Sequence, residues 1–91
     1  MIIIKSDEEI DLMRISGKVT GNILKELETF IKPGISTEDI DRFVETTIRD
    51  HGMIPTFKGY GGFPASACVS INEEVVHGIP DKKRIIKDGD I

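Results

Sequence analysis

Two histidines and one cysteine are the residues of this chain whose types are best suited to catalysis or metal binding. His51, Cys68 and His77 do not occur at a metal-ligand spacing such as His-x-x-x-His. Cys68 and His77 are suitable types for a nucleophile and its base. However, Cys68 lies between Ala67 and Val69, and in such an apolar segment a thiol usually behaves as a small hydrophobic side chain. The residues themselves therefore favour neither a zinc site nor a cysteine–histidine pair.

A glycine-rich segment with two aromatic residues precedes His77. Residues 58–64 read Lys-Gly-Tyr-Gly-Gly-Phe-Pro. Glycines let the backbone bend so that Tyr60 and Phe63 can line a cavity, to which His77 would add one polar group. The segment has neither the Gly-Lys-Ser/Thr ending nor the GxGxxG spacing of a phosphate-binding loop. Spacing alone leaves two interpretations equal: a pocket for a small molecule or side chain, and a surface loop over a core with His77 hydrogen-bonded locally.

Two helices are expected to support this segment. Ser6-Asp7-Glu8-Glu9 is a capping box that starts the first helix. Ser36 caps the second helix, Gly52 is a plausible terminator, and His51 suits the negative helix end. Apolar or small residues at helical spacing predict the buried stripe of each helix. In the first helix these are Ile10, Met13, Gly17, Thr20 or Gly21, Leu24, Leu27 and Ile31, and in the second Ile40, Phe43, Val44 and Thr47 or Ile48.

Short extended segments complete the predicted fold. Ile2–Ile4 is a β-branched run, and residues 67–71, 75–76 and 84–86 are expected to be strands. Asp88-Gly89 is a favoured hairpin turn, but the sequence stops two residues later. We therefore interpret Ile91 as a truncation point that leaves a sheet edge open beyond Ile86 and favours self-association. The expected fold class is α+β, with two helices packed on a curved antiparallel sheet in one domain of residues 1–91.

Composition excludes several classes of protein. The formal net charge is −4, and the only basic cluster, Lys82–Arg84, lies among aspartates, so no nucleic-acid surface is predicted. A single cysteine allows no intrachain disulfide, which fits a reducing cytosol. No apolar run approaches the length of a membrane span or a signal peptide. These features predict a cytoplasmic protein without a membrane partner.

Three blocks of sequence resemble the type I methionine aminopeptidases of bacteria. They are residues 59–64, 68–73 and 76–80, which read Gly-Tyr-Gly-Gly-Phe-Pro, Cys-Val-Ser-Ile-Asn-Glu and Val-His-Gly-Ile-Pro. The turn at 32–37 and the closing Asp-Gly-Asp-Ile at 88–91 match the same family in order and spacing. The resemblance implies an N-terminal portion of the family's pita-bread fold, in which two pseudo-symmetric halves enclose the active site.

The resemblance also implies a function. The family removes the initiator methionine from nascent proteins with two divalent metal ions, Mn, Fe, Co or Zn, that activate a bridging water. Its metal ligands are two Asp, one His and two Glu, and all are expected downstream of Ile91. The resemblance thus implies no metal ligand within residues 1–91 and an inactive isolated chain. The implied partners are nascent polypeptides that begin with Met, and with them the ribosome.

Matching positions suggest roles for individual residues. His77 corresponds to the family histidine that donates to the scissile amide of the substrate and steadies the tetrahedral intermediate. The residues that correspond to the wall of the methionine pocket are Phe57, Tyr60, Phe63 and Cys68. Phe57 stands where some bacterial relatives have Cys, and Phe63 where many have Tyr. Asn72 and Glu74 lie where some relatives bind a monovalent cation through backbone carbonyls.

Two other functions are compatible with the same fold. A proline dipeptidase-like enzyme would share the metal site but differ in the pocket, and the Tyr-Gly-Gly-Phe-Pro loop disfavours it. A pita-bread scaffold without metals could instead be a binding module that recruits proteins or RNA. The acidic balance of the chain disfavours RNA.

Overall fold

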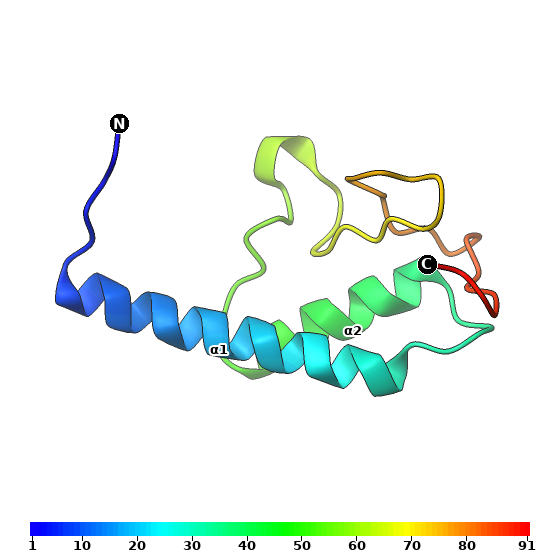
Figure 1. Ribbon diagram of the computed structural model, residues 1–91, viewed down its shortest axis with the longest axis horizontal. Coiled ribbons are helices and arrows are strands. Elements are labelled where there is room, and N and C mark those ends of the chain that lie inside the picture. Colours follow the sequence, from blue (N-terminus) through cyan, green and yellow to red (C-terminus); the bar gives the residue numbers. More distant parts are fainter.

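The computed structural model describes all residues, 1–91, and consists of two α-helices followed by a long non-helical region. Helix α1 spans Asp7–Phe30, helix α2 spans Thr37–Asp50, and a short 3-10 helix, η1, spans Tyr60–Gly62. α2 runs back along the C-terminal half of α1, and the residues that follow it lie together on one side of the helix pair (Figure 1). Neither long helix is apolar enough to cross a membrane.

Both predicted helix starts are confirmed. The Ser6 hydroxyl accepts from the Glu9 amide, and the Glu9 carboxylate accepts from the Ser6 amide, which completes the capping box of α1. Ser36 and Asp39 form the same reciprocal pair at α2. The serine supplies an acceptor to a free amide of the first turn, and the carboxylate complements the positive end of the helix dipole.

The core lies where the two helices meet, and it corrects the predicted stripe of α1. Ile23 is only 5% exposed and packs with Ile40 and Val44 of α2, as predicted for α2. By contrast Met13 is 57% and Leu24 is 64% exposed, so the predicted stripe is wrong at these positions. Because α2 crosses only the C-terminal half of α1, it selects one face of α1. That face carries Val19, Ile23, Leu27 and Phe30.

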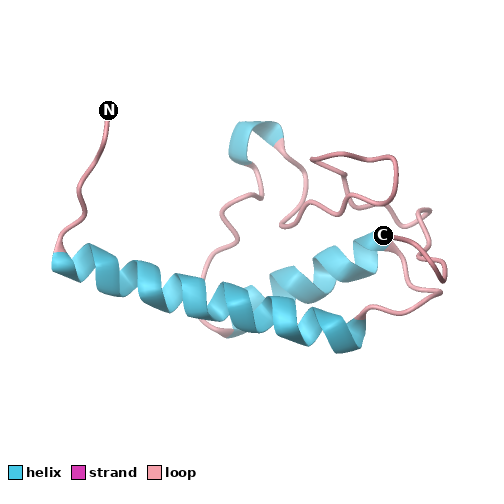
Figure 2. Cartoon of the chain, in the orientation of Figure 1, coloured by secondary structure: helices cyan, strands magenta, loops and turns pink.

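The predicted antiparallel sheet is absent, and Figure 2 shows helices and loops only. The segments 67–71, 75–76 and 84–86 do not form strands, and neither does Ile2–Ile4, whose side chains are exposed. A strand requires a continuous ladder with a neighbour. Residues 2–4 and 75–76 make no backbone–backbone hydrogen bond, residues 67–71 make two, and residues 84–86 make four, of which three reach the segment that leads into α2. There is consequently no sheet whose edge lies open beyond Ile86, contrary to expectation.

Residues 84–86 pair instead with the segment that leads into α2. The Ile86 amide donates to the Ile35 carbonyl at 2.8 Å, and the Thr37 amide donates to the Arg84 carbonyl at 3.0 Å. These bonds surround a single antiparallel bridge between Ser36 and Ile85. The Asp88-Gly89 turn is present as predicted, with Gly89 at φ +91°.

A wide apolar groove of about 860 Å³ remains between the helices and the segments 52–57 and 66–70. Its floor is the helix–helix core, including Ile23, Ile40 and Val44. The core is therefore shallow on the side that faces the later part of the chain.

Candidate functional site

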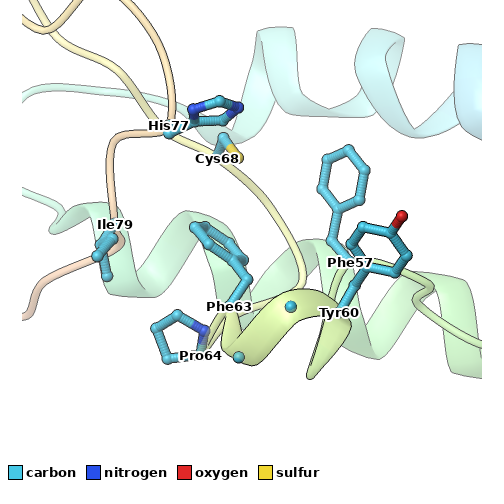
Figure 3. A pocket seen from close by; sticks show the side chains of 9 residues that line it. Phe57, Tyr60, Phe63, Pro64, Cys68, His77 and Ile79 are labelled. Atoms are coloured by element: carbon cyan, nitrogen blue, oxygen red, sulfur yellow. The ribbon is translucent and has the colours of Figure 1, made fainter.

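Five of the residues singled out by sequence lie around one apolar pocket of about 510 Å³ (Figure 3). These are the residues predicted to bind the substrate, namely Phe57, Tyr60, Phe63, Cys68 and His77. Two further side chains, Pro64 and Ile79, were not predicted. The complete lining is Phe57, Tyr60, Gly61, Gly62, Phe63, Pro64, Cys68, His77 and Ile79.

The glycine-rich loop forms most of this wall because its glycines adopt conformations that other residues avoid. Gly59, Gly61 and Gly62 have φ values of +83°, +57° and +83°. The Gly59 amide donates to the Phe63 carbonyl at 2.8 Å, which closes the loop on itself. This tight turn presents Tyr60 and Phe63 to the same cavity, so the pocket interpretation is favoured over a loop that merely covers the core.

Along the extended segment 67–69, side chains that face the core alternate with one that faces the pocket. Ala67 and Val69 pack against the helix core, whereas Cys68 lies between them and lines the pocket. Successive side chains of an extended backbone point to opposite sides, and this produces the separation. No residue that lines the pocket is a member of the core cluster.

His77 is held beside Cys68 by the backbone that follows it. The Val69 amide donates to the Gly78 carbonyl at 2.9 Å, and the Gly78 amide donates to the Ser70 hydroxyl at 3.0 Å. His77 itself has φ +56°, a left-handed conformation that is uncommon outside glycine and asparagine. Figure 3 shows the imidazole near the Cys68 sulfur at one end of the pocket. His51 lies elsewhere, at the end of α2, where its Nδ1 is 2.8 Å from the Thr47 carbonyl.

Two carboxylates of α2, Asp41 and Glu45, were missed as contributors to the site. Glu45 accepts from the Lys58 ammonium at 2.8 and 3.0 Å, from Arg49 Nε at 3.0 Å and from the Ser66 hydroxyl. The hydrogen bonds from Lys58 and Arg49 lower the pKa of Glu45 from 4.5 to about 2. Only the i, i+4 spacing of Asp41 and Glu45 could have indicated that they share one helix face.

Asn72, predicted near a monovalent cation, lies in a polar turn away from the pocket wall. Its backbone is left-handed at φ +53°, and its side chain bonds Asp90 and the Ile91 amide. Two hydrogen bonds lower the pKa of Asp90, chiefly the one from the Asn72 side chain and next the one from the Lys87 amide. The Glu74 carboxylate accepts from the Ile71 amide at 3.1 Å.

The chain's own residues do not form a site for a divalent metal. No three His, Cys, Asp or Glu side chains converge closely enough to hold one. The arrangement therefore combines an apolar pocket, one imidazole and one thiol, which suits binding and hydrogen-bond donation to a ligand.

Comparison with known proteins places this geometry in a family. The model of metallopeptidase family M24 matches residues 11–91, which is most of the chain. The chain belongs to metallopeptidase family M24. Two curated relatives named methionine aminopeptidase and methionine aminopeptidase 1, from Clostridium acetobutylicum and Bacillus subtilis, are 58% and 52% identical over 91 residues. The chain spans 36% of the length of each of these relatives.

Solved structures of methionine aminopeptidases have a similar backbone arrangement. The Thermotoga maritima enzyme matches with a TM-score of 0.96 and 43% identity over 100% of this chain, and the Rickettsia prowazekii enzyme with 0.92 and 37% over 99%. In both, the match covers 36% of the solved chain. The resemblance to methionine aminopeptidases that was inferred from the sequence blocks is confirmed.

Proposed function

We propose that the complete protein is a metal-dependent methionine aminopeptidase in which this chain supplies the side-chain pocket and His77. The supporting observation is the convergence of Phe57, Tyr60, Phe63 and Cys68 with His77 around one apolar pocket. These are the residues that the family resemblance assigned to substrate binding. The names of the relatives support the same activity.

The pocket residues suit a methionine side chain. A thioether is polarizable and packs well against ring edges, which Tyr60 and Phe63 provide. A hydrogen bond from the imidazole N–H of His77 to the scissile amide would hold the substrate and grow stronger as negative charge develops on the carbonyl oxygen. Because Cys68 is a small side chain in an apolar wall, we assign it the role of shaping the pocket rather than attacking the substrate.

We propose that metal binding is the task of other parts of the complete enzyme. Family M24 consists of metallopeptidases, and we propose two divalent ions, Mn, Fe, Co or Zn, whose ligands lie outside residues 1–91. Such ions activate a water nucleophile when they are bound. We assign no metal ligand to residues 1–91 and propose that they bind and orient the substrate.

We further propose a cytoplasmic location and nascent polypeptides beginning with Met as substrates, which would bring the enzyme to the ribosome. The backbone carbonyls of Asn72 and Glu74 remain proposed ligands of a monovalent cation.

We also propose that the isolated chain self-associates, since large apolar side chains such as Leu24, Met13 and Ile54 are exposed. A monomer in sedimentation velocity at high concentration would contradict self-association.

Peptide hydrolysis by the complete enzyme tests the proposed activity against its rivals. We expect Met-Ala-Ser to be cleaved after Met in the presence of Mn²⁺ or Co²⁺, and Ala-Pro to remain intact. Cleavage of Ala-Pro alone would indicate a proline dipeptidase. Binding of peptides without cleavage under any metal would instead support a binding module.

A further inference from the structure

The pocket loop, residues 55–67, is connected to the rest of the chain by a small set of polar contacts. All backbone hydrogen bonds of residues 55–63 remain within that segment. Seven of the nine residues that line the pocket belong to 57–68, the other two being His77 and Ile79. The position of the pocket therefore depends on what fixes this loop from outside.

Every hydrogen bond that joins the pocket loop to another part of the chain ends on Asp41 or Glu45 of α2. Asp41 Oδ1 accepts from the amides of Ser66 and Ala67, both at 2.8 Å. Glu45 accepts from Lys58 at the beginning of the loop and from the Ser66 hydroxyl, at 3.2 Å, near its end. One turn of helix thus holds both ends of the segment.

These contacts lie in a partly protected environment. Ser66 is 6% exposed, and the Glu45 side chain is 21% exposed against 46% for Lys58. Hydrogen bonds to charged groups are stronger than neutral ones, and removal of a partner from a buried donor leaves it unsatisfied. Three left-handed glycines give the loop little preference for its own orientation. The two carboxylates consequently accept all the hydrogen bonds that join the loop to α2.

We propose that Asp41 and Glu45 are positioning residues that orient the pocket loop and so set which N-terminal side chain the pocket accepts. The role of Asp41 and Glu45 in loop placement is independent of the activity. Their role in the choice of the N-terminal side chain rests on the proposed function. Separate experiments test the two roles.

The first experiment measures backbone amide order parameters of Gly59, Gly61 and Gly62 by NMR in the 91-residue chain. In Lys58→Met we expect them to fall from roughly 0.85 to below about 0.6. Lys58→Arg retains the cation and should preserve them. Glu38→Gln is the matched control. It removes the i, i+4 ion pair between Glu38 and Arg42 of α2, at 2.9 Å, and does not affect the loop. Unchanged order parameters in both Lys58→Met and Glu45→Gln would overturn the proposal.

The second experiment measures the ratio of kcat/KM for Met-Ala-Ser over Leu-Ala-Ser in the complete enzyme. This ratio does not depend on the fraction of folded enzyme, so a purely structural role would leave it unchanged. In Lys58→Met and Glu45→Gln we expect it to fall about tenfold, within the range for small changes in an apolar pocket, and kcat for the Met peptide to change little. Lys58→Arg should restore the ratio, and Glu38→Gln should not alter it. A reduced kcat with an unchanged ratio would refute the role in side-chain choice. An enzyme that cleaves no Met peptide would defeat the proposed function, whereas the order parameters would still decide the role in loop placement.

Discussion

Gly78 lies so close to the carbonyl group of Val69 that no side chain can be accommodated at position 78. A Cβ built there would approach Val69 C to 2.7 Å and Ser70 Cα to 2.9 Å, and these are backbone atoms that cannot rotate away. The same approach allows the Val69 amide to reach the Gly78 carbonyl. Because His77 and Cys68 directly precede these two residues, the contact places the imidazole and the thiol at one end of the pocket.

Gly78→Ala is expected to destabilise the chain by about 1–3 kcal/mol, the usual cost of inserting a methyl group into a well-packed region. Gly17→Ala is the matched control, since a Cβ at Gly17 meets no atom within 4 Å. Alanine inside a helix should stabilise α1 by roughly 1 kcal/mol. Urea denaturation of the two variants measures both effects, and equal changes in the unfolding free energy would contradict the close contact.

Thr37→Val should weaken the junction between α2 and residue 81. Thr37 is 1% exposed, and its hydroxyl donates to the Asp81 carbonyl at 3.1 Å and accepts from the Asp81 amide at 2.8 Å. Valine has the same shape but leaves both Asp81 groups without this partner, at an expected cost of about 1–3 kcal/mol. Thr46→Val on the exposed face of the same helix should change the unfolding free energy by less than about 0.5 kcal/mol. An unchanged unfolding free energy of Thr37→Val in urea would show that water replaces the hydroxyl.

The ionisation of Glu45 predicts how the loop contacts respond to acid. The pKa of Glu45 is lowered from 4.5 to about 2, chiefly by hydrogen bonds from Lys58 and Arg49. Its contribution to stability is therefore complete above pH 4.5 and is lost as the pH falls toward 2. Carbon NMR of the Glu45 carboxyl should give a midpoint near the lower value, shifted upward in Lys58→Met and unchanged in Glu38→Gln. A midpoint near 4.5 in the unaltered chain would refute the contacts described for Glu45.

Replacement of His77 in the complete enzyme is expected to lower turnover by about 10²–10³, the usual effect of losing one transition-state hydrogen-bond donor. The left-handed φ of +56° complicates His77→Ala, because alanine resists that conformation. His77→Asn tolerates it and therefore separates the loss of the imidazole from backbone strain. Steady-state kinetics of both variants provide the test, and turnover within threefold of the parent in His77→Asn would refute the assigned role.

The isolated chain, residues 1–91, is expected to have no aminopeptidase activity. Its pocket can hold a side chain, but no three potential ligands converge on a metal. The assay is release of Met from Met-Ala-Ser with added Mn²⁺ or Co²⁺, and the complete enzyme is the positive control. Metal-dependent turnover by the chain alone would overturn this expectation.

Local chemistry was predictable from the sequence, and non-local pairing was not. Ser6 and Ser36 cap their helices because capping depends on residues three positions apart. The glycine-rich loop bends because glycine adopts left-handed conformations without steric cost. The buried face of α1 depends on where α2 crosses it, which periodicity cannot specify when Leu24 and Ile23 are both apolar. Residues 84–86 pair with the segment before α2, nearly fifty positions away, and no local pattern encodes that partner.

The site residues divide in the same way, into those predictable from local sequence or motifs and those that depend on distant contacts. Tyr60, Phe63 and His77 were predicted to share a cavity from the glycine-rich loop, and the family resemblance added Phe57 and Cys68. All five line one pocket, and their roles in substrate binding stay predictions. Asp41 and Glu45 were missed because acidic residues on a helix are common, and their meaning depends on Ser66, Ala67 and Lys58 reaching them from a distant part of the chain.

The alternation of residues 67–69 has a consequence for how such a protein can change over time. Ala67 and Val69 serve the core while Cys68 serves the pocket, and no residue belongs to both sets. Mutations at positions 57, 60, 63 or 68 can therefore alter ligand preference with little penalty in stability. The shape of the pocket and the stability of the fold depend on separate positions, so this pocket can diversify under selection while the scaffold beneath it stays the same.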